Sequence, residues 1–260
     1  MGILYLVATP IGNLADISVR ALETLRTVQL IAAEDTRQTS KLLKHYNIQT
    51  QLTSYFEHNK LRKLSFLLDA LSAGDVALVS DAAPPDLNDP GYEFVRAALE
   101  AGHTICPIPG PTAPVTALIA SGLPTDRFLY MGYLPRKSAE RCRLLDEVEK
   151  LPYTLIFLEV PHRLLDSLED ILNTLGDRQI AIARELTKIH EEIIRGSISE
   201  GIKYFSENSP RGEFTLVISG WAAKETIEWS ENYLRSVLEE GLASDLSPAR
   251  LASQIAVKSG

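Results

Sequence analysis

The sequence predicts an α/β protein built on parallel sheets. Short, continuous apolar runs such as residues 3–8 (ILYLVA) alternate with amphipathic segments such as residues 61–71 (LRKLSFLLDAL). Continuous apolar strands are typical of parallel sheets that are covered on both faces. Repeated strand–helix alternation implies right-handed crossovers. The alternation resumes after Gly122-Leu123-Pro124-Thr125, which predicts two α/β domains.

In the first half of the chain, each apolar run is followed by a helical pattern. We expect strands at residues 3–8, 29–33, 52–55, 76–80 and 104–108, and helices at 18–27, 39–46, 61–71, 92–100 and 113–121. The patterns over 61–71 and 92–100 end at Gly74 and Gly102, as helices often do.

The second half is also α/β, with an antiparallel element expected near its end. We expect strands at residues 128–131, 154–158, 180–183, 192–195 and 214–218, and helices at 138–150, 163–175, 225–241 and 248–257. This gives an N-terminal α/β domain over 1–122, a C-terminal α/β domain over 123–222 and a helical tail over 223–260.

Composition excludes several classes of protein. Of 260 residues, 45% are apolar and 23% charged, and no apolar run is long enough for a membrane span. The apolar start reads as a buried first strand, not a signal peptide. Two cysteines and five histidines show no metal-ligand spacing, so we expect no metal and a reducing, cytoplasmic location. A net charge of −8 argues against binding nucleic acid by bulk charge, but it allows a local basic patch.

Three loops rich in Gly and Pro follow predicted strands, at residues 9–14, 80–91 and 109–113. Parallel strands end at one edge of their sheet, where ligands bind. Each loop alone is better explained as a turn, but three at one edge favour a ligand cleft. The chain has neither GxGxxG after its first strand nor GxxxxGK[ST], so we expect a ligand without phosphate, held by backbone groups and one or two carboxylates.

Seven segments of the chain are distinctive. They are LYLVATPIGNLADISVRALETL, IAAEDTRQTSKLLKHYNI, SDAAPPDLNDPGYEFV, PIPGPTAPVTALIASGLPTDRFLYMGYLPRK, FLEVPHRLLDSLEDI, ARELTKIHEE and RGEFTLVISG. Together they resemble the ribosomal RNA small subunit methyltransferase I family of the tetrapyrrole-methylase superfamily. The resemblance covers about residues 3–220 in order, and the combination of PIGNL, EDTR and ARELTK is specific. The end of the chain resembles the family's C-terminal helical module but stops early, which favours a truncated tail.

The resemblance implies two α/β domains of the class III methyltransferase type with a cofactor cleft between them. It also implies S-adenosylmethionine as cofactor, a homodimer, and 2'-O-methylation of a cytidine in 16S rRNA of the small ribosomal subunit. By position, the residues expected around the cofactor are Pro10, Ser80, Asp81, Ala82, Ala83, Pro111, Thr112, Ala113, Met131, Leu134, Glu159, Arg184 and Phe214.

One loop departs from the family pattern. The family has Ser-Asp-Ala-Gly-Thr/Met-Pro where this chain has Ala83 and Pro84 in place of the Gly and the residue after it. Alanine is penalised if the glycine has a positive φ, and Pro84 and Pro85 restrict the residues before them. We expect a stiffer, reshaped loop.

A ribose hydroxyl is a poor nucleophile, so a proton acceptor is expected near it. Candidates for catalysis are Asp81, Glu185 and His190, with Lys188 lowering the pKa of the hydroxyl. Glu185 and Lys188 are also explained as a solvated ion pair, and His190 as a surface histidine.

For RNA, the densest basic cluster is formed by Arg136, Lys137, Arg141 and Arg143, directly after an aromatic segment. Cations beside aromatic rings are a common way to hold unstacked bases. Arg37 and Lys41 extend the patch, although a solvated helix start gives the same pattern.

Two alternatives stay open. One is a methyltransferase acting on a small tetrapyrrole, with the same fold and cofactor. The other is a catalytically weak RNA-binding assembly factor, suggested by Ala83 and Pro84. The EDTR and ARELTK segments favour the rRNA enzyme over the tetrapyrrole methyltransferase.

Overall fold

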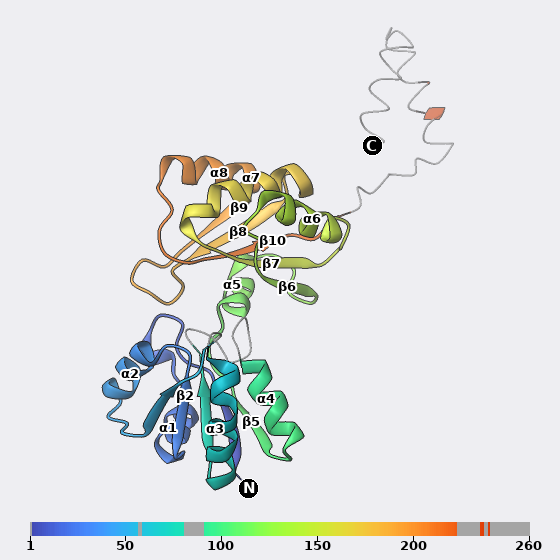
Figure 1. Cartoon of the computed structure of the whole chain (residues 1–260). Helices are drawn as coiled ribbons and strands as arrows, with labels where there is room; N and C mark the ends of the chain where they lie inside the picture. Colours follow the sequence, from blue (N-terminus) through green and yellow to red (C-terminus); the bar gives the residue numbers. More distant parts are fainter. Residues whose placement is uncertain (1, 57–58, 81–90, 223–234, 237–238, 240–260) are drawn as a thin grey trace. The chain divides into compact units, whose positions relative to one another are not determined.

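A computed structural model describes residues 2–56, 59–80, 91–222, 235–236 and 239 of the chain (Figure 1). The chain divides into two compact units, residues 1–220 and 221–260. The expected tail helices at 225–241 and 248–257 fall almost entirely outside the described residues; only 235, 236 and 239 are described, and they are helical. Among the described residues, no helix is both long and apolar enough to cross a membrane.

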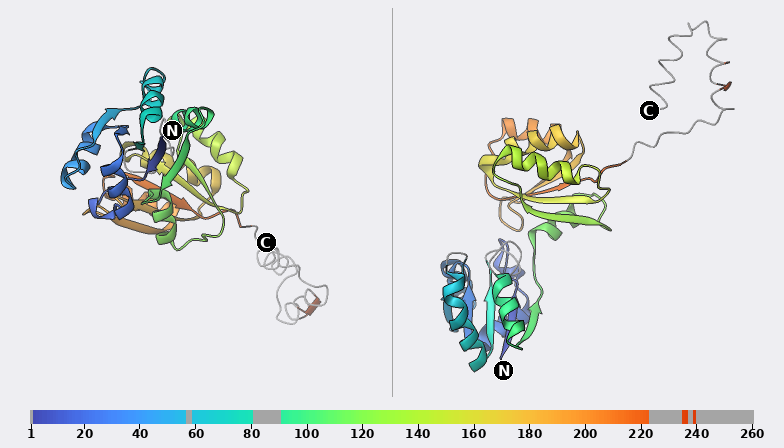
Figure 2. Two further views of the ribbon diagram at one scale, coloured as in Figure 1. Left: turned by 90° about the horizontal axis from the view of Figure 1, so that it is seen from below. Right: turned by 45° about the vertical axis from the view of Figure 1, so that its right-hand side comes forward.

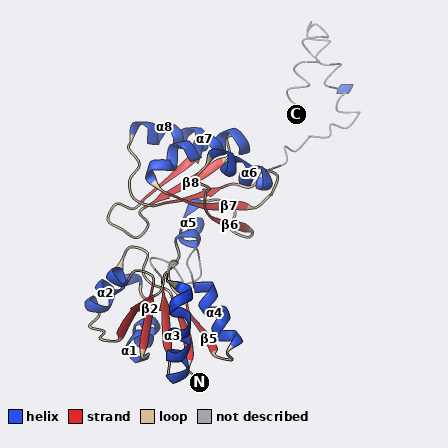
Figure 3. Cartoon of the chain, viewed as in Figure 1, coloured by secondary structure: helices blue, strands red, loops and turns tan. Residues whose placement is uncertain are grey.

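The first sheet is entirely parallel, as the sequence predicts. Its strand order is β3-β2-β4-β1-β5, and every neighbouring pair is parallel. Figure 3 shows the strands of this sheet in red with the helices beside them in blue. The strands are β1 (Ile3–Val7), β2 (Leu30–Ala33), β3 (Gln51–Ser54), β4 (Val76–Val79) and β5 (Thr104–Ile108). The helices that follow the first four strands are α1 (Val19–Thr27), α2 (Thr36–His45), α3 (Lys60–Ala73) and α4 (Gly91–Glu100).

Alternate residues of β2 face opposite sides of this sheet. Ile31 and Ala33 belong to a core with Leu25 and Leu42 of α1 and α2. Leu30 and Ala32 belong to a second core, which includes residues of α3 and α4. The whole of β2 is buried because helices cover both faces, which is why the strand reads as a continuous apolar run.

The second sheet is mixed, with strand order β6-β7-β10-β8-β9. β6 pairs with β7 in parallel, and the other pairs are antiparallel, which confirms the antiparallel element expected near the end of this half. The strands are β6 (Phe128–Tyr133), β7 (Thr154–Glu159), β8 (Gln179–Arg184), β9 (Glu192–Ser197) and β10 (Phe214–Ile218).

The two faces of this sheet are covered by different helices. One face carries α6 (Ser138–Val148), α7 (Leu164–Leu175) and α8 (Ile198–Glu207), whose buried residues share one core with the strands (Figure 2). On the other, Ala117 and Leu118 of α5 (Ala113–Ser121) pack with Ile156 and Val217. Ile11, from the loop after β1, belongs to that same cluster.

Local capping explains where the structure differs from the sequence prediction. α2 begins at Thr36 instead of residue 39 because the Asp35 side chain accepts a hydrogen bond from the Arg37 amide at 2.8 Å. α8 was not predicted. Its signal is a capping box in which Ser197 and Glu200 satisfy each other's backbone amides.

We predict that Leu168→Ala lowers the free energy of unfolding by about 2–5 kcal/mol, because the Leu168 side chain on α7 is fully buried in the core of the second sheet and its loss leaves a cavity. The matched control is Leu99→Ala on α4, where the leucine is 58% exposed and the expected change is within about 0.5 kcal/mol. Urea denaturation of both variants measures the difference, and equal losses would contradict the assigned core.

Candidate functional site

The three loops predicted to share one edge of the first sheet follow β1, β4 and β5. These strands are adjacent and parallel, so their carboxyl ends lie together. The Thr9 hydroxyl donates to the Ser80 carbonyl at 2.7 Å and joins the first two loops. A Cβ on Gly110 would lie 2.9 Å from that of Ala8, so glycine lets the third loop pass close to the first. Asp81, Ala82 and Ala83, with Pro84, lie outside the described residues.

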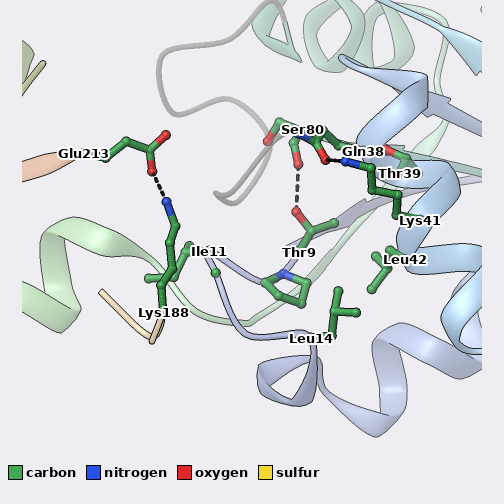
Figure 4. Close-up of a pocket in the computed structure, with 12 residues that line it drawn as sticks. Thr9, Ile11, Leu14, Gln38, Thr39, Lys41, Leu42, Ser80, Lys188 and Glu213 are labelled. Carbon is green, nitrogen blue, oxygen red and sulfur yellow. Dashed lines mark hydrogen bonds and ion pairs between the residues drawn. The ribbon is translucent and has the colours of Figure 1, made fainter. Parts of the chain in front are cut away.

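A cavity of about 480 Å³ opens at this edge (Figure 4). Its volume is within the usual range for small-molecule sites. The loop after β1 and helix α2 contribute most of the lining, and Ser80, Lys188 and Glu213 contribute the rest. The full lining is Thr9, Pro10, Ile11, Gly12, Leu14, Gln38, Thr39, Lys41, Leu42, Ser80, Lys188 and Glu213.

Two glycines bring three distant segments into contact beside this cavity. A Cβ on Gly12 would lie 2.5 Å from Lys188 Cγ and 2.9 Å from the Leu186 carbonyl oxygen. A Cβ on Gly212 would lie 2.4 Å from the side chain of Glu185. Glycine is therefore required at both positions for the PIGN, ARELTK and RGEF segments to meet.

At this meeting point, Lys188 bridges two carboxylates. Its Nζ lies 2.8 Å from Glu185 Oε1 and 3.0 Å from Glu213 Oε2. Burial alone would lower the pKa of Lys188, but hydrogen bonds to the two carboxylates raise it above its ordinary value. Burial alone would raise the pKa of Glu185, but hydrogen bonds from Lys188 and the Glu213 amide lower it. Lys188 is thus held as a cation and Glu185 as an anion.

The loop that carries Glu185 and Lys188 has an unusual backbone. Glu185 and Thr187 have φ values of 50° and 65°, a region that non-glycine residues seldom adopt. The Thr187 amide donates to Glu191 Oε2 at 2.6 Å, and the Lys188 amide donates to the Glu185 carbonyl at 3.0 Å. Such strain persists only where surrounding contacts fix it, and it is common at functional sites.

Glu159, Arg184 and Phe214 lie side by side, because Phe214 of β10 pairs with Glu159 of β7 and with Arg184 of β8. Their side chains are engaged within the second sheet. Glu159 is 1% exposed and accepts from Arg163 at 2.9 Å and Ser167 at 2.5 Å. Phe214 packs in the core, and Arg184 donates to the Arg211 carbonyl at 3.0 Å.

The other residues expected around the cofactor divide between the cavity and its surroundings. Pro10 and Ser80 line the cavity, and Ala113 lines a smaller adjacent space with Ile11 and Glu213. Pro111 and Thr112 lead into α5, and neither lines the cavity. Met131 and Leu134 pack against the core of the second sheet.

The expected basic cluster splits into exposed and buried parts. Arg136 and Lys137 are exposed. Arg141, in contrast to the sequence prediction, is 3% exposed and pairs with Asp170, its Nε lying 2.7 Å from Oδ2. It also donates to the Pro135 carbonyl at 3.1 Å. Arg141 therefore fixes the backbone next to Arg136 and Lys137 and is not itself part of the exposed basic surface.

The cations of α2 also differ from each other. Arg37 is exposed and paired with Asp35, and its hydrogen bonds lower the pKa of that carboxyl to about 2. Lys41 lines the cavity, where its Nζ donates to Gln38 Oε1 at 3.0 Å. His190 is exposed and does not line the cavity.

A family model for tetrapyrrole (corrin/porphyrin) methylases matches residues 3–201. The chain belongs to the tetrapyrrole methylase family. Within this family it is 50% identical over 258 residues to a ribosomal RNA small subunit methyltransferase I from Synechocystis sp., covering 98% of this chain and 92% of that relative. A relative of the same name from Escherichia coli O157:H7 is 51% identical over 228 residues, covering 86% and 80%.

Solved structures of other tetrapyrrole methylases share the fold. A uroporphyrin-III-C-methyltransferase from Thermus thermophilus aligns with a TM-score of 0.57 at 21% identity, covering 84% of this chain and 94% of that one. The cobalt precorrin-4 methyltransferase CbiF aligns with a TM-score of 0.63 at 16% identity, covering the same shares. At these identities the likeness concerns the fold alone.

Sequence reasoning about this tetrapyrrole methylase missed Gly212 and Glu213 as parts of the site, and it included Gly12 only as a member of the predicted ligand loop at residues 9–14. All three lie in segments that carry the family resemblance, PIGNL and RGEF. Their residue types gave no separate signal, because glycine marks turns generally and glutamate is common on surfaces.

We predict that Glu185→Gln lowers the free energy of unfolding by about 1–2 kcal/mol at neutral pH, since hydrogen bonds to a charged group are lost. The pKa of Glu185 is depressed in the folded state. The stabilisation is therefore complete above the unfolded value of about 4.3 and disappears as the pH falls through the folded value. Chemical denaturation of wild type and variant from pH 7 downward measures this. A difference independent of pH would contradict an ionic role for Glu185.

Proposed function

We propose that this chain methylates ribosomal RNA of the small subunit, transferring a methyl group from S-adenosylmethionine to the 2'-oxygen of a cytidine in 16S rRNA. The observation that carries the proposal is the identity of about half of all residues, over nearly the whole chain, with relatives named ribosomal RNA small subunit methyltransferase I. The arrangement beside the cavity supports it, because a fixed cation and a carboxylate suit a reaction at a hydroxyl group.

The residues at the sheet edge fit the proposed cofactor. S-adenosylmethionine, when bound, supplies a methyl group on a positively charged sulfur. The cavity combines an apolar wall, formed by Ile11, Leu14 and Leu42, with polar groups at its rim. A Cβ at Gly12 would fill space against Lys188, so the loop after β1 is shaped for close approach. We propose that Pro10, Ser80 and Ala113 hold the cofactor together with residues 81–83, 111–112, Met131, Leu134, Glu159, Arg184 and Phe214.

The chain's own residues contribute mainly orientation and electrostatics. The Thr9–Ser80 hydrogen bond fixes two of the loops that would surround the ligand. Lys188, held in its charged form, would stabilise negative charge that develops on the ribose oxygen. Positioning two reactants in line is itself a large part of such a catalytic effect.

Arg136 and Lys137 are exposed at the start of α6 and would contact RNA phosphates, with Arg37 and Lys41 extending the contact from α2. A local group of cations of this kind allows an acidic chain to bind RNA. We also propose that the protein acts in the cytoplasm as a homodimer, as the resemblance implies.

A small tetrapyrrole is the second candidate substrate, favoured by the solved relatives that share the fold. Fold alone does not fix the substrate, and the sequence identity to the rRNA enzymes is much higher. A catalytically weak assembly factor is the third candidate, and it is suggested by Ala83 and Pro84 in place of the family's usual residues.

We predict that the purified chain transfers labelled methyl groups from S-adenosylmethionine to small ribosomal subunits that lack this modification, and not to precorrin-type substrates. Mass spectrometry of nuclease digests identifies the methylated nucleoside. Methylation of the tetrapyrrole alone would support the second candidate. RNA binding with neither methyl transfer nor calorimetric binding of the cofactor would support the third.

We further predict that Arg136→Ala with Lys137→Ala weakens binding to small subunits and reduces the salt slope of binding by about 2, roughly 1 for each cation that no longer neutralises a phosphate. Cofactor affinity should stay unchanged. Arg141→Ala is the contrasting variant, because loss of its buried pairing with Asp170 should destabilise the fold. A double variant with unaltered salt dependence would show that Arg136 and Lys137 form only a solvated surface.

A further inference from the structure

Among the described residues that line the cavity, Glu213 is the carboxylate, and one of its oxygens is not used in a hydrogen bond. Its Oε2 accepts from Lys188 at 3.0 Å, whereas Oε1 accepts no hydrogen bond within the part of the chain that the structure describes. The side chain is 68% exposed and lines the cavity. A carboxylate offers about four lone-pair positions, so Glu213 can pair with Lys188 and still accept a proton from a ligand.

The other candidate proton acceptors are less suitable. Glu185 Oε1 already accepts from Lys188 and from the Glu213 amide. Its Oε2 accepts no hydrogen bond among the described residues, but Glu185 does not line the cavity and only 20% of its side chain is exposed. Lys188 is held protonated by its two carboxylates, so it can donate but not accept. His190 is exposed and does not line the cavity.

Lys188 also has unused hydrogen-bonding capacity. Its ammonium has three N–H groups, of which two are directed to Glu185 and Glu213 among the described residues. A spare N–H donor therefore lies next to the spare Oε1 acceptor of Glu213. A hydroxyl group donates one hydrogen bond and accepts others, so this pair is complementary to a hydroxyl.

Backbone contacts hold Glu213 in this place. It directly precedes β10, and its carbonyl accepts from the Glu185 amide at 3.0 Å. Gly212, at φ +83°, leaves room for the Glu185 side chain beneath it. Glu185 therefore orients both Lys188 and the Glu213 backbone and acts as a positioning residue.

We infer that Glu213 accepts the proton of the substrate hydroxyl while Lys188 donates a hydrogen bond to the same oxygen. This rests on the proposed function, with the ribose 2'-hydroxyl as substrate. In the step, the hydroxyl proton moves to Glu213 and the oxygen forms a bond to the methyl carbon. The carbon–sulfur bond breaks, and its electron pair stays on sulfur as a neutral thioether.

The pKa of Tyr133 responds to the charge of Glu213. The pKa of its phenol is raised, first by burial and then by the negative charge of Glu213. Within the described residues, the titratable groups that bear on Glu213 are thus Lys188 and Glu185 from the β8–β9 loop and Tyr133 from β6.

The test is Glu213→Gln, assayed for methyl transfer to small subunits at saturating substrates across a range of pH. The amide can still accept from Lys188 but is a far weaker base. We expect the rate to fall about 10²- to 10⁴-fold, the usual range for general base catalysis. We also expect the wild-type rate to fall at acid pH and the Glu213→Gln rate not to fall there, with cofactor affinity and melting temperature unchanged in the variant. Glu213→Asp should recover part of the rate.

Two controls separate this role from a structural one. Glu185→Gln should lose stability but keep the acid decline in its remaining rate, because it leaves the acceptor in place. Glu100→Gln removes an exposed carboxylate that pairs with Arg96 at 2.9 Å on α4, and it should match wild type. A Glu213→Gln rate within about threefold of wild type, or a reduced rate that keeps the acid decline, would overturn the inference.

A readout independent of activity is the titration of Tyr133, followed by NMR of ring-labelled tyrosine. Its pKa should fall in Glu213→Gln and stay unchanged in Glu100→Gln. No change in Glu213→Gln would overturn the placement of the charge and the inference with it. Wild type that leaves small subunits unmethylated would overturn the proposed function itself, whereas active wild type with an active Glu213→Gln variant overturns only the role of Glu213.

Discussion

The ion cluster of Glu185, Lys188 and Glu213 is the interaction on which the candidate site depends. It joins the β8–β9 loop to the start of β10, and Lys188 in turn packs against Gly12 of the loop after β1. A lysine with two carboxylate partners stays charged although it is partly buried, because hydrogen bonds to the charged form outweigh the cost of desolvation. The cluster thereby fixes a cation at the edge of the cavity.

The backbone around the cluster is conformationally strained, and this strain costs free energy. Glu185 and Thr187 both have positive φ values. Single residues of this kind cost on the order of 1 kcal/mol or more each. The hydrogen bonds that the Thr187 amide donates to Glu191 and the Glu185 amide donates to the Glu213 carbonyl offset that cost locally. Replacing the cluster by apolar side chains would remove the hydrogen bonds that hold the positive-φ backbone in place. It would also remove the positive charge of Lys188 from the cavity lining.

Two further ion pairs, next to β7 and α6, hold backbone segments in place. Arg163 pairs with Glu159 and donates to the Leu134 carbonyl, and Arg141 pairs with Asp170 and donates to the Pro135 carbonyl. The buried guanidinium of Arg141 and the partly buried guanidinium of Arg163 thus hold the chain segment that presents Arg136 and Lys137. Because arginine offers five donors in a rigid fork, one side chain can pair with an acid and still hold a backbone carbonyl.

The sequence by itself determined the α/β class, the parallel first sheet and the antiparallel element of the second, because apolar periodicity and glycine placement are local properties. It also determined the family, through PIGNL, EDTR and ARELTK. Only the tertiary structure decided which side chains serve the site. Arg141 and Arg136 look alike in the sequence, yet one is buried on Asp170 and the other is exposed. Glu213 gains its place from strand pairing and from contacts made 25 and 28 residues away in the chain. Burial and pairing at such separations depend on how the sheet is assembled, and no local pattern specifies them.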